Sequence, residues 1–366
     1  LRLVGSEMCI RDRIYYVKGA FMSLLQETCG AITGRSLKIE QHIFNSWNAE
    51  SPVELYGRLV DVVAQYGAAT NQEQVTVPKP CMIIASADHG VADMGVSAYP
   101  KETTVGMTQN YLIPKGAGAN SLANYCGAQM EVIDMGIDAD MSWVPGLRSH
   151  KLGMGTKNFV EEPAMTREQA VEGIETGIRL VKEKIDEGFN VFLVGEMGIS
   201  NTTASALMTA KFAGLTAEEA TGRGTNISDE RLKLKQRIVH DVLEKYKDIS
   251  KDDALGILSS VGGFEFACIV GVILGAAANH GLVIIDGFNT SACALVAKTL
   301  APKAMDYVMA SHLSAEKAAK SSLENLGLEA YVDLGLCLGE ASGGSIQMGM
   351  LDLAVHMYMA ITGGNK

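Results

Sequence analysis

Short, continuous apolar runs recur along the chain, and each is followed by small or polar residues. In the clearest case, residues 81–85 read Cys-Met-Ile-Ile-Ala and lead into Ser-Ala-Asp-His-Gly at 86–90. A run that is apolar at every position is typical of a parallel strand covered on both faces. Similar runs, which we also interpret as strands, occupy residues 131–134, 190–194, 282–285 and 306–310.

Segments with helical spacing of apolar residues fill the intervals between these runs. Residues 22–70 are expected to be mostly helical. Within them, apolar residues recur at helical spacing at Leu55, Leu59, Val63 and Tyr66, with Val60 alongside. Further helices are expected at residues 117–126, 166–187, 202–212, 229–246, 263–279, 291–299, 314–326 and 343–360. This alternation predicts an α/β fold with a mostly parallel sheet, in which ligands bind at the carboxyl ends of the strands.

The composition narrows the class of protein. The chain has 366 residues, 47% of them hydrophobic and 20% charged, and can bury a substantial core. Its net charge of −11 argues against non-specific binding to nucleic acid or to an anionic membrane.

Seven cysteines lie singly, without a Cys-x-x-Cys pair, which favours reduced thiols in the cytoplasm over a zinc or redox site. The most apolar run, residues 266–278, is shorter than the ~20 residues that cross a bilayer, and predicts a buried helix.

The beginning of the chain differs from the rest. Residues 1–13 show no clear hydrophobic period and no signal-peptide core followed by a cleavage site. We therefore expect residues 1–21 to be a non-native or disordered extension, with Met22 as a plausible native start.

The strongest candidate for chemistry is a carboxylate near the end of the chain. Residues 338–344 read Leu-Gly-Glu-Ala-Ser-Gly-Gly and precede a long apolar helix. The small residues leave room beside Glu340 for a flat ligand, and the helix dipole is expected to favour its ionised form. A carboxylate held in a partly dry pocket is suited to act as a base. The alternative is an acidic residue that only stabilises the helix dipole.

A second candidate turn follows the strand at 190–194. Residues 195–203 read Gly-Glu-Met-Gly-Ile-Ser-Asn-Thr-Thr and open a helix. Ser200 or Asn201 is expected to cap this helix, whose free amides suit an anion, and Glu196 supplies a second carboxylate. Ordinary helix capping is the alternative interpretation.

A third turn, residues 222–226, combines glycines with Arg223 before another helix. Small residues, a guanidinium and a helix N-terminus together can hold a phosphate, and Lys235 could reach back from the helix. The alternative is a glycine-rich loop with a solvated arginine. The amides of Gly262 and Gly263 are a further candidate contact for phosphate or ribose, although glycine pairs also permit close helix packing.

Other residues are weaker candidates. Asp88 and His89 match no standard metal-ligand spacing, so we interpret them as a hydrogen-bonded structural pair. Ser311 is expected to face the site, and Ser314 to cap the following helix. An apolar slot for a flat ring would be formed by Tyr99, Met107, Met197 and Leu338. Taken singly, these residues are more typical of core packing. The sequence has no phosphate-binding Gly-Lys-Ser/Thr loop, no His-Glu-x-x-His and no Gly-x-Ser-x-Gly.

Taken together, these segments resemble the nicotinate-nucleotide–dimethylbenzimidazole phosphoribosyltransferase family. Each segment alone is weak, but the ordered set is specific and extends over about residues 22–361. The matching segments are 87–91, 95–100, 195–203, 222–225, 261–265, 286–288, 311–316 and 338–343.

The resemblance implies an architecture. A Rossmann-like large domain is expected at residues 76–340, and a small helical domain is expected from both chain ends, residues 22–75 and 341–366. The family also implies a homodimer in which the partner's small domain helps to close the cavity.

The resemblance also implies a reaction. Phosphoribose would pass from nicotinate mononucleotide to 5,6-dimethylbenzimidazole or a similar base. The products would be nicotinate and an α-ribazole 5'-phosphate-type nucleotide for cobamide (vitamin B12) assembly, and neither metal nor other cofactor is implied. One alternative is a non-catalytic base- or nucleotide-binding relative. A Rossmann oxidoreductase is disfavoured, because no Gly-x-Gly-x-x-Gly turn follows the first strand.

The family's functional residues can be placed on this sequence. Its general base falls on Glu340, its second carboxylate on Glu196 and its lysine on Lys235. Its base-binding slot falls on Tyr99, Met107, Met197 and Leu338. The expected phosphoribosyl contacts are Gly198, Asn201, Thr202, Gly222, Gly224, Lys235, Gly262, Gly263 and Ser311.

Overall fold

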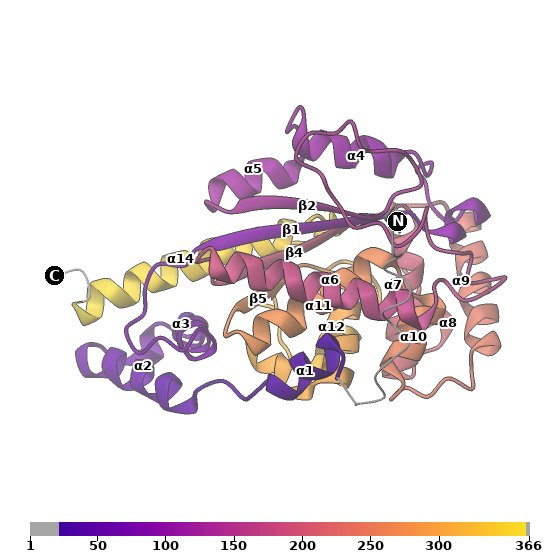
Figure 1. Cartoon of the computed structure of the whole chain (residues 1–366). Helices are drawn as coiled ribbons and strands as arrows, with labels where there is room; N and C mark the ends of the chain where they lie inside the picture. Colours follow the sequence, from indigo (N-terminus) through magenta and orange to yellow (C-terminus); the bar gives the residue numbers. More distant parts are fainter. Residues whose placement is uncertain (1–21, 364–366) are drawn as a thin grey trace, which may run out of the picture.

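A six-stranded parallel sheet forms the centre of the computed structural model, which describes residues 22–363 (Figure 1). The strand order is β3-β2-β1-β4-β5-β6. Strands β2 and β3 therefore follow β1 toward one edge of the sheet, and β4 pairs with the other side of β1 and is followed by β5 and β6 toward the opposite edge. The expected extension, residues 1–21, lies outside the described residues. The strands are β1 (Pro80–Ala87), β2 (Gln129–Gly136), β3 (Arg148–Ser149), β4 (Val191–Met197), β5 (Leu282–Ile285) and β6 (Val308–Met309).

The continuous apolar runs predicted the central strands correctly. Every residue of β1 and β5 is buried, because helices cover both faces of the sheet. The last strand, β6, is shorter than the expected 306–310, since a 3-10 helix beginning at Pro302 takes up the chain as far as Tyr307. The two-residue edge strand β3 was not predicted from the sequence.

Helices α11 (Phe264–Ala278) and α12 (Phe288–Leu300) pack on one face of the sheet, and α6 (Arg167–Asp186) packs along α11. The two helices α6 and α11 approach closely because glycines face each other. A β-carbon at Gly271 would lie 1.9 Å from the Ile174 carbonyl oxygen, and one at Gly177 would lie 2.0 Å from that of Cys268. The apolar run at 266–278 is therefore a buried helix, as predicted. No helix within residues 22–363 is long and apolar enough to cross a membrane.

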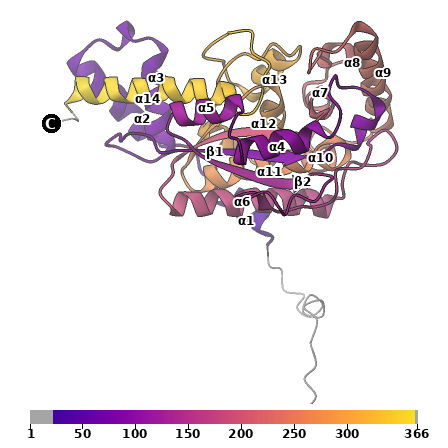
Figure 2. The same cartoon turned by 90° about the horizontal axis from the view of Figure 1, so that it is seen from above.

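The opposite face carries α4 (Thr103–Leu112), α5 (Gly118–Tyr125) and α14 (Ser342–Thr362). Helix α14 also contacts α2 (Leu37–Glu50) and α3 (Arg58–Ala69), so helices from the two ends of the chain lie together (Figure 2). The Trp47 ring, for example, lies 5.6 Å from that of Tyr358. This packing agrees with a helical unit built from both ends, whose domain boundaries stay a prediction.

The remaining helices pack mainly on other helices rather than on the sheet. They are α1 (Leu24–Ala31), α7 (Asn201–Ala213), α8 (Ala217–Ala220), α9 (Asp229–Lys245), α10 (Ala254–Val261) and α13 (Ala319–Leu326), with short 3-10 turns at Val53–Leu55, Gly90–Met94 and Pro302–Tyr307. Helices α4, α8 and α10 were not predicted.

Helix α13 begins later than expected, and Ser314 does not cap it. Ala318 is the N-cap residue, without a side-chain hydrogen bond. The chain before it is extended because the Leu313 and Ala315 amides donate to the carbonyls of Val332 and Leu336, both at 2.8 Å. This pairing is tertiary, so the local sequence does not reveal it.

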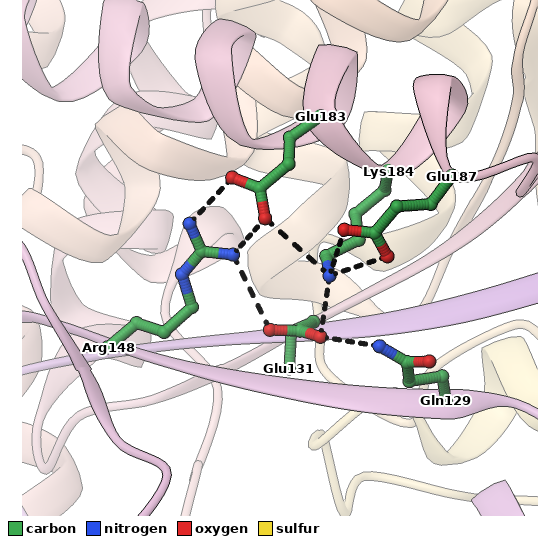
Figure 3. A network of polar contacts seen from close by, with 6 residues as sticks. All are labelled: Gln129, Glu131, Arg148, Glu183, Lys184 and Glu187. Atoms are coloured by element: carbon green, nitrogen blue, oxygen red, sulfur yellow. Dashed lines mark hydrogen bonds and ion pairs between the residues drawn. The ribbon is translucent and has the colours of Figure 1, made fainter.

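An ion-pair network ties α6 to the edge of the sheet at the amino end of β2 (Figure 3). The Lys184 ammonium lies 2.9 Å from the carboxylate of Glu131 and 3.0 Å from that of Glu187. Arg148 of β3 lies 2.7 Å from Glu183 and 3.7 Å from Glu131. The network lies at the other end of the sheet from the expected site.

Candidate active site

Polar side chains gather where β1, β4 and β5 end, at the point where the strand order reverses. Asp88 follows β1, Glu196 lies near the end of β4 and Asp286 follows β5. All three are buried. Ligands of open α/β sheets bind at such a switch point. The turn that carries Glu340 arrives here as well, since a β-carbon at Gly339 would lie 3.0 Å from Glu196 Oε1.

The backbone around Glu340 has an uncommon conformation. Three consecutive residues, Gly339, Glu340 and Ala341, have positive φ angles of 83°, 59° and 59°. For the two residues with side chains this conformation costs roughly 1–2 kcal/mol each. The turn rests directly on Gly195 of β4, where a β-carbon would lie 2.6 Å from the Ala341 nitrogen and 2.8 Å from the Glu340 carbonyl carbon. Strain retained in this way is often associated with a functional site.

The environment of Glu340 differs from the one expected from the helix dipole. Its side chain is buried, with 8% exposure, and burial raises its pKa. The Tyr111 hydroxyl acts in the opposite direction, and the charge of Asp286 raises the pKa of Glu340 further. Two amides in the first turn of α14, those of Gly343 and Gly344, donate to Asp286 rather than to Glu340. The expected stabilisation of the ionised form by the dipole is therefore wrong, because Asp286 occupies the helix terminus.

Glu196 is a second buried carboxylate with an altered pKa. Burial raises its pKa to about 7, against the effect of hydrogen bonds from Asn289 and Asn201. The Asn201 side-chain amide donates to Glu196, and Asn289 donates in turn to Asn201 at 3.1 Å. A carboxyl with this pKa can hold or release a proton near neutral pH.

The start of α7 differs from the expected capping. Ser200 is the N-cap residue, but its φ of 76° leaves it without a side-chain cap, and Asn201 is bonded to Glu196 instead. The Ser200 hydroxyl is buried and has no hydrogen-bond partner within residues 22–363. It is therefore free to meet a ligand.

Three of the expected phosphoribosyl contacts come together around Lys235. The Lys235 ammonium is almost fully buried and donates to the Thr202 hydroxyl at 2.8 Å. A β-carbon at Gly224 would lie 2.7 Å from Thr202 Oγ1 and 3.4 Å from Lys235 Nζ. Burial lowers the pKa of Lys235 to about 8. A buried ammonium with two further donor positions is suited to an anionic ligand.

The loop at 222–226 differs from the expected cradle in two ways. Its Gly224 amide donates to Glu316 Oε1 at 2.8 Å, and a β-carbon at Gly222 would lie 2.0 Å from the other Glu316 oxygen. Arg223 turns away to pair with Asp229 and donates to the Ile227 carbonyl at 2.7 Å. A carboxylate of the protein therefore occupies the loop.

Gly198 and Gly263 lie beside a fully buried pair formed by His89 and Glu265. His89 Nε2 lies 2.6 Å from Glu265 Oε1, and β-carbons at the two glycines would lie 3.3 and 2.4 Å from the Glu265 oxygens. The expected hydrogen-bonded pair of Asp88 and His89 is not formed, because His89 bonds to Glu265 and Asp88 accepts from the Asp138 amide at 2.8 Å. Gly262 donates its amide to the Leu258 carbonyl at 2.9 Å, so this amide does not point to a ligand as expected.

The expected base slot is only partly formed. Met107 and Met197 are half-buried and pack against the core. Tyr99 and Leu338 are 56% and 57% exposed. Ser311, also expected at the site, is buried and donates to the Asp286 carbonyl at 2.6 Å. Within residues 22–363, no group of three or more His, Cys, Asp or Glu side chains is arranged to hold a metal ion.

Sequence reasoning missed Tyr111 and the role of Asp286. Tyr111 lies on α4 and is buried. Its hydroxyl forms no hydrogen bond with any of the described residues. Burial raises the pKa of Tyr111 well above 10, and the charges of Glu340 and Glu196 add to this effect. The phenol therefore lies near both carboxylates. Helix α4, which carries Tyr111, has no clear apolar period, so the sequence offered little signal for it.

Fold and site together define an enzyme of the phosphoribosyltransferase class. The chain belongs to the family described as Phosphoribosyltransferase, whose model matches residues 38–364. The family predicted from the ordered motifs is therefore confirmed.

Relatives and solved structures make the likeness more specific. A Geobacter sulfurreducens protein named nicotinate-nucleotide–dimethylbenzimidazole phosphoribosyltransferase is 42% identical over 310 residues, 85% of this chain and 88% of the relative. A Chloroflexus aggregans protein of the same name is 42% identical over 303 residues, 83% and 85% of the two chains. The crystal structure of CobT from Thermus thermophilus has a TM-score of 0.83 at 33% identity, covering 88% of this chain and 96% of that one.

Proposed function

We propose that this chain transfers phosphoribose from nicotinate mononucleotide to 5,6-dimethylbenzimidazole or a similar flat base. The products are nicotinate and an α-ribazole 5'-phosphate-type nucleotide for the nucleotide loop of a cobamide. The observation that carries the proposal is the meeting of Glu196 with the strained Gly339–Glu340 turn at the switch point of the sheet. The relatives named above supply the identity of the substrates.

The chemistry of the donor explains why one base is enough. The glycosidic nitrogen of nicotinate mononucleotide is a pyridinium, so it leaves with the bonding electron pair as a neutral ring and needs no general acid. The attacking base forms the new bond to the anomeric carbon through its lone-pair nitrogen. Attack from the opposite face inverts that carbon and gives the α-linked product.

Glu340 is the general base of this proposal. As the new bond forms, the attacking ring becomes cationic and its other N–H becomes acidic, and the Glu340 carboxylate takes that proton. Burial and the charge of Asp286 raise the pKa of Glu340, which makes it a better proton acceptor than an exposed carboxylate. A single base of this kind contrasts with the paired carboxylates of glycosidases.

The remaining site residues bind the donor in this proposal. Glu196, held by Asn201, stabilises the positive charge that develops on the ribose. The phosphate binds Lys235 and the turn between Gly198 and Thr202. The loop at 222–226 is a poorer phosphate site than its glycines suggest, because Glu316 already holds the Gly224 amide.

The test is release of nicotinate from its mononucleotide, measured with and without 5,6-dimethylbenzimidazole. We expect release that depends on the base, together with a product of the mass of the ribazole phosphate. Competition between benzimidazole, purine and phenolic bases in one reaction identifies the preferred acceptor. Binding of either substrate without nicotinate release would favour the alternative, a non-catalytic relative.

We extend the proposal to a homodimer in the cytoplasm whose partner helps to close the cavity. Large apolar side chains remain exposed around α14 and the segment before it: Tyr125, Leu334, Leu338 and Leu353. A second copy that covers them would complete the half-open base slot at Leu338. The cysteines of the described residues are free, in keeping with a reducing compartment. Light scattering that shows a monomer at assay concentrations would contradict the dimer.

A further inference from the structure

The turn that carries Glu340 is held from two sides. Beneath it, Gly195 of β4 leaves no space between strand and turn. On the other side, Asp286 Oδ1 accepts hydrogen bonds from the amides of Gly343 at 2.6 Å and Gly344 at 3.2 Å. These amides open α14 directly after the turn, so the carboxylate anchors the helix at the residues nearest to Glu340.

We propose that Asp286 is a positioning residue for the reaction, which keeps Glu340 in its left-handed conformation and acts on the Glu340 carboxylate through its charge. The inference rests on the proposed function, because it takes Glu340 as the base. A neutral serine or asparagine could cap this helix equally well. Burial of a charged carboxylate costs free energy that a neutral cap avoids. The presence of a buried carboxylate here therefore suggests a use for its charge.

The position of Asp286 is itself fixed by its surroundings. The Ser311 hydroxyl donates to its backbone carbonyl at 2.6 Å. His312 packs directly against the start of α14, since a β-carbon at Gly343 would lie 1.8 Å from His312 Nδ1. Burial raises the pKa of Asp286, while His312 and the amides of α14 favour its charged form. The segment around Ser311 thus supports the site through Asp286.

The ionisable groups that face Glu340 come from three elements. Tyr111 lies on α4, Asp286 follows β5, and Glu196 of β4 lies beside Gly339. The charge of Asp286 raises the pKa of Glu340, so removal of that charge lowers it. In the proposed reaction Glu340 must be deprotonated to accept the proton and Glu196 must be charged to stabilise the ribose, so kcat/KM rises with pH through the pKa values of both. The charge of Asp286 raises the pKa of Glu196 as well. Loss of the Asp286 charge should move this acid limb to lower pH.

The test compares Asp286→Asn with the wild-type chain. Asparagine keeps an oxygen that can accept from both amides but carries no charge. We expect the acid limb of the kcat/KM profile for nicotinate release to move to lower pH, with little change in melting temperature. Asp286→Ala removes the anchor as well, and should lower kcat by about tenfold to a hundredfold while the KM for the donor changes less.

Asp134→Asn is the matched control. Asp134 Oδ1 also accepts two backbone amides at a strand end, those of Gly136 at 3.0 Å and Ile137 at 2.9 Å. It lies within β2, near the end of the strand, where its other oxygen is 2.7 Å from Lys151 Nζ. It is not among the charges that act on Glu340, so its variant should leave the acid limb in place. An active Asp286→Asn enzyme whose acid limb coincides with that of the wild type would overturn the role of Asp286 alone. A wild-type chain that releases no nicotinate would instead contradict the proposed function, and this role with it.

Discussion

Glu340 and Glu196 are two buried carboxylates whose surroundings suit them to different tasks. Glu340 has one phenol nearby and faces the charge of Asp286, so its proton affinity is raised. Glu196 accepts a hydrogen bond from the Asn201 amide, which Asn289 holds in turn, yet burial still raises the pKa of Glu196 to about 7. The first group fits a proton acceptor, and the second fits a group fixed in place beside the sugar. The sequence predicted both residues, but not the neighbours that tune them.

Tyr111→Phe tests how Glu340 is tuned. The Tyr111 hydroxyl lowers the pKa of Glu340 by favouring its charged form, so its removal should raise that pKa. The acid limb of the kcat/KM profile should then move to higher pH, opposite to the shift expected for Asp286→Asn. Tyr66→Phe is the control, because the Tyr66 hydroxyl donates to the Thr76 carbonyl at 3.1 Å, away from the site. An acid limb that stays in place for Tyr111→Phe would contradict this effect of the phenol on Glu340.

Strand ends and helix starts fix the site more than any loop does. The end of β4 presents Glu196, and Gly195 before it supports the Glu340 turn. Helix α4 joins the site because its Thr104 hydroxyl accepts from the Ile199 amide at 3.2 Å. The apolar runs made β4 predictable. By contrast, α4 depends on contacts with distant strands, and its threonines, glycine and asparagine gave no helical period.

Gly195→Ala tests the support beneath the turn. A methyl group there would lie 2.6 Å from the Ala341 nitrogen and must displace the turn. We expect kcat to fall by about tenfold to a hundredfold, because a shift of about 1 Å misplaces the base. Circular dichroism should still report a folded chain. In the control Gly30→Ala nothing lies within 4 Å of the new methyl group, and wild-type activity is expected. Normal kcat in Gly195→Ala would show that the turn is not held there.

Lys184→Met tests the ion-pair network between α6 and the sheet edge. The buried ammonium compensates Glu131 and Glu187, so its loss should lower the free energy of unfolding by about 1–3 kcal/mol. Activity should persist, since the network lies at the amino end of β2. Lys182→Met removes only an exposed pair with Asp186 on the same helix, and should change stability by less than about 0.5 kcal/mol. Equal melting temperatures for the two variants would contradict the structural role of Lys184.

Across the whole molecule, the candidate active site and the ion-pair network of Lys184 lie at opposite ends of one sheet. The carboxyl ends of β1, β4 and β5 gather the candidate site, while the ion pairs of Lys184 brace the amino end of β2. The alternation of apolar runs and helical segments was enough to predict this α/β architecture. Features set by tertiary pairing were not predictable, such as the late start of α13 and the occupation of the glycine loop by Glu316.

Glu340 is the group that accepts the ring proton in the proposed reaction, and no other residue of the site has this role. Glu340→Gln keeps the size and polarity of the side chain but cannot take up that proton. Nicotinate release should fall by about two to four orders of magnitude, while the dissociation constant for nicotinate mononucleotide stays near the wild-type value. Glu329→Gln is the control, because that carboxylate is 83% exposed and lies 3.8 Å from Arg58, away from the site. Near-normal turnover in Glu340→Gln, with the control also active, would contradict the central claim.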